Sequence, residues 1–160
     1  MLYYAYHYDF NSKKLGMETE VFKITPDYIE LVKKIQEKFR YIISEKGIMI
    51  ECNPTSNYLI GTIDKYDMHP ITVFNNMGLE YQEDKISDCA QICVSINTDD
   101  QGVFDTSLTN EYAIICSALD KKKDKNGNKV YSPEHIYQYI ENIRKMGIHQ
   151  SFDNHINELN

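Results

Sequence analysis

Apolar residues recur at three- and four-residue intervals in three long segments of the chain. These segments cover residues 28–43, 107–119 and 132–146, and their spacing predicts three amphipathic helices. Hydroxyl residues that can cap a first helical turn precede them at Thr25, Ser107 and Ser132. We expect Gly47 to end the first helix in a left-handed conformation and Gly147 to end the third.

Two short apolar runs, residues 48–50 and 92–96, lie between these segments and predict buried strands. The alternation of strand and helix predicts βα units around a parallel sheet, and therefore an α/β fold. Between the two runs, we expect residues 53–57 to form a loop and His69-Pro70 to open a short helix.

The first 24 residues have a less regular pattern. The aromatic-rich residues 1–10 suit either a strand or the end of a helix, and both alternatives stay open. Residues 11–16 predict a polar turn, and residues 18–24 predict a short strand or an extended arm.

Length and charge exclude several classes of partner. A chain of 160 residues is long enough for one domain, and its net charge of -7 argues against a nucleic-acid backbone as the main partner. No apolar stretch reaches the roughly 20 residues of a membrane span, and the N-terminus lacks the pattern of a signal peptide. The four cysteines form no C-x-x-C pair, so we expect reduced thiols and a cytoplasmic protein.

Carboxylates follow both predicted strands. Asp99 and Asp100 come directly after one strand, and Glu51 comes after the other. Side chains at the carboxyl ends of parallel strands meet at one edge of the sheet, where they can bind a metal or a polar substrate. The alternative for the Asp99-Asp100 pair is a turn that caps backbone donors. A further alternative is a small independent fold that binds a divalent cation through these three acids.

The five histidines do not occur at the spacing of a metal site. They form no H-x-H, H-x-x-H or H-E-x-x-H pattern, and a catalytic zinc needs about three protein ligands. The chain alone therefore predicts no complete zinc site. We expect His69 to serve the loop or helix start at Pro70.

Five motifs together resemble the C-terminal part of the adenosine deaminase family of metal-dependent hydrolases, over residues 31–152. The motifs are Glu51-Cys52-Asn53-Pro54-Thr55-Ser56-Asn57, His69-Pro70, Ser95-Ile96-Asn97-Thr98-Asp99-Asp100, Ser107-Leu108-Thr109-Asn110-Glu111-Tyr112 and Gln150-Ser151-Phe152. Gln101 departs from the family pattern, which usually has Pro there. Within the family, the resemblance is closest to the large deaminases of bacterial antiviral defence systems.

The resemblance implies the C-terminal portion of a (β/α)₈ TIM barrel. Residues 1–47 would form a helical arm, and residues 48–160 would form the last two βα units and the C-terminal helices of a single partial domain. Asp99 would be the carboxylate ligand of a catalytic zinc and would orient the activated water. Asp100 would hydrogen-bond the purine ring, and Glu51 would support the barrel mouth. The family's histidine ligands and its proton-donating Glu have no counterpart here.

A whole barrel takes roughly 250 residues, so this chain has the length of about half a barrel. We expect a fragment of a zinc-dependent deaminase of adenosine or a related purine nucleoside or nucleotide, inactive without the missing barrel half. Exposed sheet edges favour self-association or pairing with that half. The alternative is a non-catalytic interaction module descended from such a deaminase.

Overall fold

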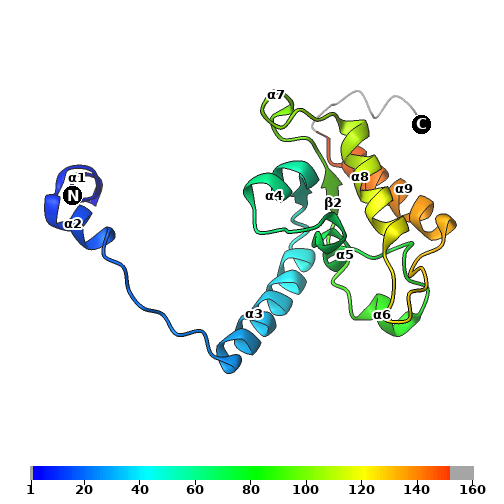
Figure 1. Ribbon diagram of the computed structural model, residues 1–160, viewed down its shortest axis with the longest axis horizontal. Coiled ribbons are helices and arrows are strands. Elements are labelled where there is room, and N and C mark those ends of the chain that lie inside the picture. The colour runs from blue at the N-terminus through cyan, green and yellow to red at the C-terminus, as the bar shows by residue number, and fades with distance from the viewer. Residues whose placement is uncertain (1, 152–160) are drawn as a thin grey trace. The chain divides into compact units, whose positions relative to one another are not determined.

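The computed structural model describes residues 2–151 and divides into two compact units, one ending at Ile35 and the other beginning at Gln36. Phe152, the last residue of the fifth motif, and residues 153–160 lie outside the described residues. In order, the elements are α1 Leu2–Tyr8, α2 Phe10–Gly16, α3 Pro26–Glu45, β1 Ile50–Cys52, α4 Pro54–Ile60, the 3₁₀ helix η1 Tyr66–Met68, α5 Ile71–Phe74, α6 Glu83–Ser87, β2 Val94–Ile96, α7 Gln101–Phe104, α8 Leu108–Lys121 and α9 Pro133–His149 (Figure 1).

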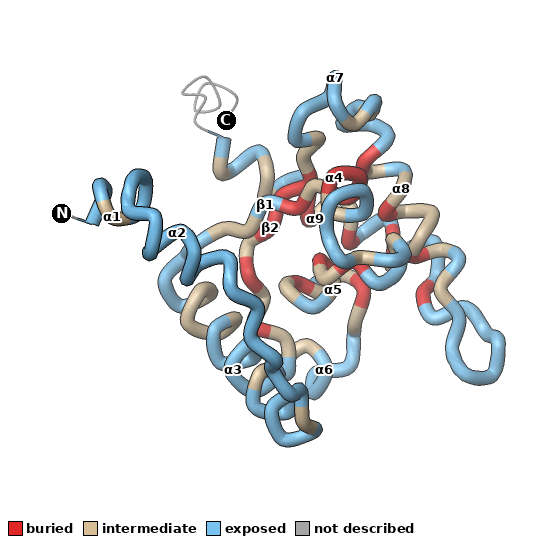
Figure 2. The backbone as a smooth tube through the Cα atoms, turned by 60° about the vertical axis from the view of Figure 1, so that its left-hand side comes forward, coloured by how far each residue is buried: buried red, intermediate tan, exposed pale blue. Residues whose placement is uncertain are grey.

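The first unit contains two short helices with no buried residues (Figure 2). The prediction of a polar turn over residues 11–16 was wrong, because α2 covers them. The Asp9 side chain accepts a hydrogen bond from the Ser12 backbone N–H at 2.9 Å and caps this helix. Of the two alternatives for residues 1–10, α1 favours the helix. Residues 18–25 have no regular secondary structure.

The predicted long helix is confirmed as α3, which extends into the second unit. Gly47 has a φ of +63°, the left-handed conformation expected of it. The Ile48 N–H donates to the Ile43 carbonyl at 3.1 Å, and the Gly47 N–H donates to the Ser44 carbonyl at 2.9 Å. These bonds satisfy the last carbonyls of the helix and turn the chain towards β1.

The two strands form a parallel pair, as the βα pattern predicts. Glu51 lies opposite Ser95 in the register, and the Asn97 N–H donates to the Cys52 carbonyl at 2.9 Å. The first strand lies at Ile50–Cys52, two residues later than predicted. Because the strands are parallel, both carboxyl ends lie at the same edge of the sheet.

The core of the second unit lies between the strands and the two C-terminal helices. Helix α9 packs against β2, and α8 packs against both α9 and α4 (Figure 1). Buried red segments gather around these elements in Figure 2. The main apolar contributors are Cys52, Ile71, Val94, Ile96, Ile115, Leu119, Ile136, Tyr139 and Ile143. Burial raises the pKa of the Cys52 thiol to about 12, and all four cysteines are free.

Gly147 does not end the last helix, which corrects the sequence prediction. Helix α9 continues through it to His149. A Cβ atom on Gly147 would lie 3.5 Å from the Ser95 Cβ, so this glycine sits where the helix passes close to β2. Because 3.5 Å is an ordinary contact distance, the packing here does not require a glycine.

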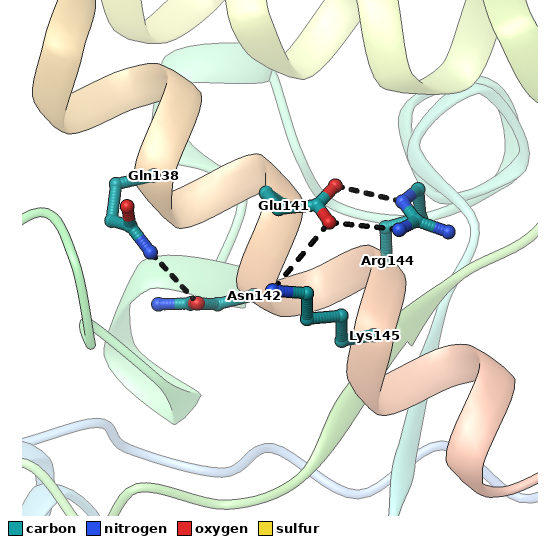
Figure 3. A network of polar contacts seen from close by, with 5 residues as sticks. All are labelled: Gln138, Glu141, Asn142, Arg144 and Lys145. Carbon is teal, nitrogen blue, oxygen red and sulfur yellow. Dashed lines mark hydrogen bonds and ion pairs between the residues drawn. The ribbon is translucent and has the colours of Figure 1, made fainter. Parts of the chain in front are cut away.

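The outer face of α9 carries a polar network (Figure 3). Arg144 donates to both carboxylate oxygens of Glu141, at 2.7 and 2.8 Å, and Lys145 forms a second ion pair with Glu141. The Asn142 amide donates to the Met77 carbonyl at 3.0 Å and ties α9 to the segment after α5. The charged pairs are exposed, so they contribute little to stability.

Within residues 2–151, no helix combines the length and the apolar character that crossing a membrane requires.

Candidate functional site

Asp99 lies at the carboxyl edge of the sheet, just beyond β2, and Ser56 holds its side chain. The buried Ser56 hydroxyl donates to Asp99 Oδ2 at 2.8 Å. Asp99 is exposed and has a φ of +55°, a left-handed conformation that few residues other than glycine adopt. Ser56 is on α4, after β1, so this bond joins the segments that follow the two strands.

Asp100 has a different environment from its neighbour. Its Oδ1 accepts hydrogen bonds from the backbone N–H groups of Gly102, at 2.9 Å, and Val103, at 3.0 Å. It is therefore the N-cap of α7. The capping alternative proposed for the acid pair thus describes Asp100 in this structure, whereas Asp99 makes a side-chain contact across the sheet edge.

Glu51 lies on β1 and its side chain is exposed. The hydrogen bonds and ion pairs of the described residues do not connect Glu51 to Asp99 or Asp100. The structure thus brings Asp99 together with Ser56, while Glu51 shares only their edge of the sheet.

The loop predicted over residues 53–57 was wrong, because α4 begins at Pro54. The Asn57 side chain connects this helix to its surroundings: its Oδ1 accepts from the Asn53 N–H at 3.1 Å and contacts His69 Nε2 at 3.0 Å. His69 Nδ1 accepts the Ile71 N–H at 3.2 Å, so Nε2 carries the proton that it donates to Asn57. The expected helix-start role of His69 is confirmed.

His69 is 4% exposed. This burial lowers the pKa of its imidazole, and the Glu111 carboxylate opposes the shift by favouring the charged ring. The hydrogen bonds and the lowered pKa together describe a neutral histidine that is part of the scaffold of the strand ends.

Glu111 belongs to the fourth sequence motif, but the sequence assigned it no role. It is fully buried in the first turn of α8, where its Oε2 accepts the Thr55 N–H at 2.8 Å and its Oε1 accepts the Thr106 hydroxyl. The sequence contains one indication of this burial. Glu111 lies four and eight residues before the buried Ile115 and Leu119, and therefore on the same face of the helix. An acid on the apolar face of a helix predicts a buried carboxylate with specific donors.

Two pockets lie on the surrounding elements, and neither is lined by Asp99, Asp100 or Ser56. One, of about 630 Å³, lies along α8, and Thr55, Thr106 and Lys121 are among its lining residues. The other, of about 790 Å³, lies at the end of β2, where Asn97, Tyr112 and Arg144 contribute to its walls. Glu111 accepts hydrogen bonds from Thr55 and Thr106, and both of these residues line the first pocket.

The described residues do not fit a complete metal centre. Within residues 2–151, no three His, Cys, Asp or Glu side chains are grouped so that they could hold a metal ion. A catalytic zinc requires about three protein ligands. Asp99 fits the role of one carboxylate ligand, because Ser56 fixes one of its oxygens and the carboxylate is exposed.

The adenosine deaminase family matches residues 29–127. Adenosine deaminase of Shewanella denitrificans is 33% identical over 49% of this chain and 20% of its own length. Adenosine deaminase of Enterococcus faecalis is 33% identical over 56% of this chain and 20% of its own length. Aminodeoxyfutalosine deaminase of Streptomyces avermitilis is 35% identical over 49% of this chain and 18% of its own length. The matched part of the chain thus spans about a fifth of the length of these curated relatives. No solved structure matches the chain.

Proposed function

Because the chain belongs to the adenosine deaminase family, we propose that it supplies the last two strand–helix units of a (β/α)₈ barrel that deaminates a purine nucleoside or nucleotide. The observation that carries the proposal is the contact of Asp99 with Ser56 at the carboxyl edge of two parallel strands. Barrel enzymes of this architecture place their chemistry at that edge. Two helices, α4 and α7, follow the strands there, each within a few residues of the strand end.

Under this proposal, Asp99 provides one carboxylate ligand to a zinc ion. The zinc would supply an activated water by lowering its pKa. The Ser56 hydroxyl fixes Oδ2 of Asp99 and so restricts the carboxylate to one orientation.

Asp100 would contact the purine ring while its Oδ1 caps α7. The cap orients the carboxylate, and its second oxygen would accept a hydrogen bond from the substrate. Glu51 would line the barrel mouth on the neighbouring strand. The substrate class is an amino-purine nucleoside or nucleotide.

The remaining metal ligands and the rest of the barrel would come from polypeptide outside the matched segment.

A chimeric enzyme tests this function. Residues 48–121 would replace the aligned segment of the Shewanella denitrificans adenosine deaminase, and zinc content and inosine formation would be measured. We expect the chimera to retain zinc and activity, and Asp99→Asn to lower zinc affinity by at least tenfold and abolish turnover. Asp64→Asn is the matched control, because Asp64 is an exposed acid of the same segment and lines neither pocket. Equal zinc binding and turnover in the Asp99 and Asp64 variants would refute the assignment.

A second candidate function is an interaction module, and the first unit favours it. Large apolar side chains of this unit are exposed, among them Tyr4, Phe10 and Val21. Apolar side chains exposed in this unit would be covered if the chain assembled through it. A chain that assembles through this unit while its chimera neither binds zinc nor deaminates adenosine would support this function over the first.

A further inference from the structure

The buried Glu111 carboxylate connects the segments that follow both strands. Its Oε2 accepts the backbone N–H of Thr55, which lies in the first turn of α4, after β1. Its Oε1 accepts the hydroxyl of Thr106, which lies between α7 and α8, after β2. One side chain on α8 therefore connects the two segments that form the edge of the candidate site, α4 and the residues between α7 and α8.

The first connection leads directly to Asp99. Thr55 precedes Ser56, whose hydroxyl donates to Asp99 Oδ2 at 2.8 Å. Because Glu111 fixes the Thr55 backbone N–H, it also fixes the turn from which the Ser56 side chain projects. Both Ser56 and Glu111 are buried, so each is restricted to one rotamer by its packing.

The second connection leads to Asp100. The Thr106 N–H donates to the Gln101 carbonyl at 3.4 Å, and Gln101 is the first residue of α7. Asp100 caps that helix through the N–H groups of Gly102 and Val103. The Thr106 contact of Glu111 therefore holds the far end of the helix that Asp100 begins.

The chemistry of Glu111 favours a positional role. Burying a carboxylate costs free energy unless it is paired, and none of the ion pairs found among residues 2–151 includes Glu111. The two hydrogen bonds offset part of that cost. An apolar residue in the same stripe as Ile115 would stabilise the core at lower cost. Residues that lower the stability of the fold in this way concentrate at functional sites.

We propose that Glu111 is the positioning residue of the site, which sets the orientation of Asp99 through Ser56 and of Asp100 through α7. The inference rests on the proposed function of Asp99. It predicts that removal of the Glu111 acceptors displaces both acids while the α8–α9 core remains folded.

Amide correlation NMR spectra of the full 160-residue chain test this coupling directly. We expect Glu111→Ala to shift the amide signals of Ser56, Asp99 and Gly102, residues far from it in sequence. Glu111→Gln should retain their positions, because the amide oxygen can accept the Thr55 N–H and the amide nitrogen can donate to the Thr106 hydroxyl. Glu134→Ala, an exposed acid in the first turn of α9, is the matched control and should leave all three signals unchanged.

Each outcome decides the proposal. Unchanged Ser56 and Asp99 signals in Glu111→Ala would overturn it, and so would equal shifts in the Gln and Ala variants. If Glu111→Ala does not fold, Thr106→Val replaces it, because this variant removes one contact and keeps the carboxylate. Thr106→Val should then shift the signals of α7 and spare that of Thr55, and no shift in α7 would contradict the proposal.

Zinc affinity separates this inference from the proposed function. In the chimeric deaminase, Glu111→Ala should weaken zinc binding by about 10- to 100-fold, the range for residues that orient a metal ligand, and Glu111→Gln by less than tenfold. A chimera that never binds zinc would refute the proposed function, whereas the NMR coupling would stand. A chimera that binds zinc equally well with Ala at position 111 would refute the positioning role alone.

Discussion

The adjacent acids Asp99 and Asp100 have separate tasks although they share a sequence motif. Ser56 holds Asp99 from the neighbouring segment, while Asp100 satisfies two backbone donors of its own chain. The difference follows from backbone conformation: Asp99 is left-handed, whereas Asp100 is extended with a φ of -79°. At this scale, the sequence identifies the residue types, and the backbone decides which partner each carboxylate meets.

The cap at Asp100 predicts a measurable loss of stability. Asp100→Ala should lower the free energy of unfolding by about 1 kcal/mol, the usual value for a lost N-cap. Asp100→Asn should keep most of that stability, because the amide oxygen can still accept the Gly102 and Val103 N–H groups. Urea unfolding of the two variants measures the difference, and equal stability of the Ala and Asn variants would contradict the capping role.

The buried His69 predicts a loss of stability in acid. Its folded-state pKa lies below the usual 6.5 because burial disfavours the charged ring. Above pH 6.5 the ring is neutral in both states, and its contribution to stability is complete. As the pH falls through 6.5 towards the folded pKa, the unfolded chain takes up the proton first, and that contribution is lost.

Urea unfolding of the His69→Gln variant at pH 7.5 and at pH 5.5 checks this account. The variant should lose less stability between the two pH values than the native chain does. His149→Gln is the control, because His149 is exposed near the end of α9, and it should keep the native pH dependence. If the His69→Gln variant loses as much stability between pH 7.5 and pH 5.5 as the native chain does, groups other than His69 cause the loss.

At the scale of elements, apolar periodicity predicted the long helices, and contacts distant in sequence decided the short ones. Helices α3, α8 and α9 carry apolar residues at helical spacing along their length, so their patterns were sufficient. Helix α4 has the composition of a loop, and the Glu111 carboxylate that satisfies its Thr55 N–H comes from 56 positions away. Single-sequence patterns do not contain such a contact, so α4 could not be predicted. The spacing of Glu111 indicates that its side chain is buried, but it does not indicate which donors the carboxylate meets.

The contact between Ser56 and Asp99 spans 43 positions and depends on the register of the two strands. The sequence predicted that both strand ends share an edge, and this follows from parallel pairing. It did not predict which side chains meet there. Glu51, expected beside the acid pair, lies on the strand, while a serine on the following helix contacts Asp99.

Gly147 provides a test of element packing. Gly147→Ala should raise the free energy of unfolding by about 0.5–1 kcal/mol, because alanine favours the helical backbone. The added Cβ would meet the Ser95 Cβ at 3.5 Å, an ordinary contact distance. Thermal and urea unfolding would measure the gain. A lower free energy of unfolding in Gly147→Ala would mean that the added Cβ atom disturbs the packing of α9 against β2.

At the scale of the whole molecule, the proposed function gives the described residues one edge of a barrel site, and within residues 2–151 no group of side chains completes a metal centre. The matched segment spans about a fifth of the length of its relatives, and the described residues hold no metal-binding trio. A (β/α)₈ barrel needs strands beyond the parallel pair β1 and β2, and other polypeptide would supply them. The chain should therefore depend on that polypeptide for a metal centre, and its own contribution should reside in Asp99 and the residues that hold it.

The zinc stoichiometry of the purified 160-residue chain tests this claim most directly. The chain would be loaded with zinc, dialysed against a weak chelator and analysed by mass spectrometry for metal, alongside its Asp99→Asn variant and the chimeric deaminase. We predict well below one zinc per chain for the native and variant chains, and one per molecule for the chimera. One tightly bound zinc per native chain, together with conversion of adenosine to inosine, would contradict the account.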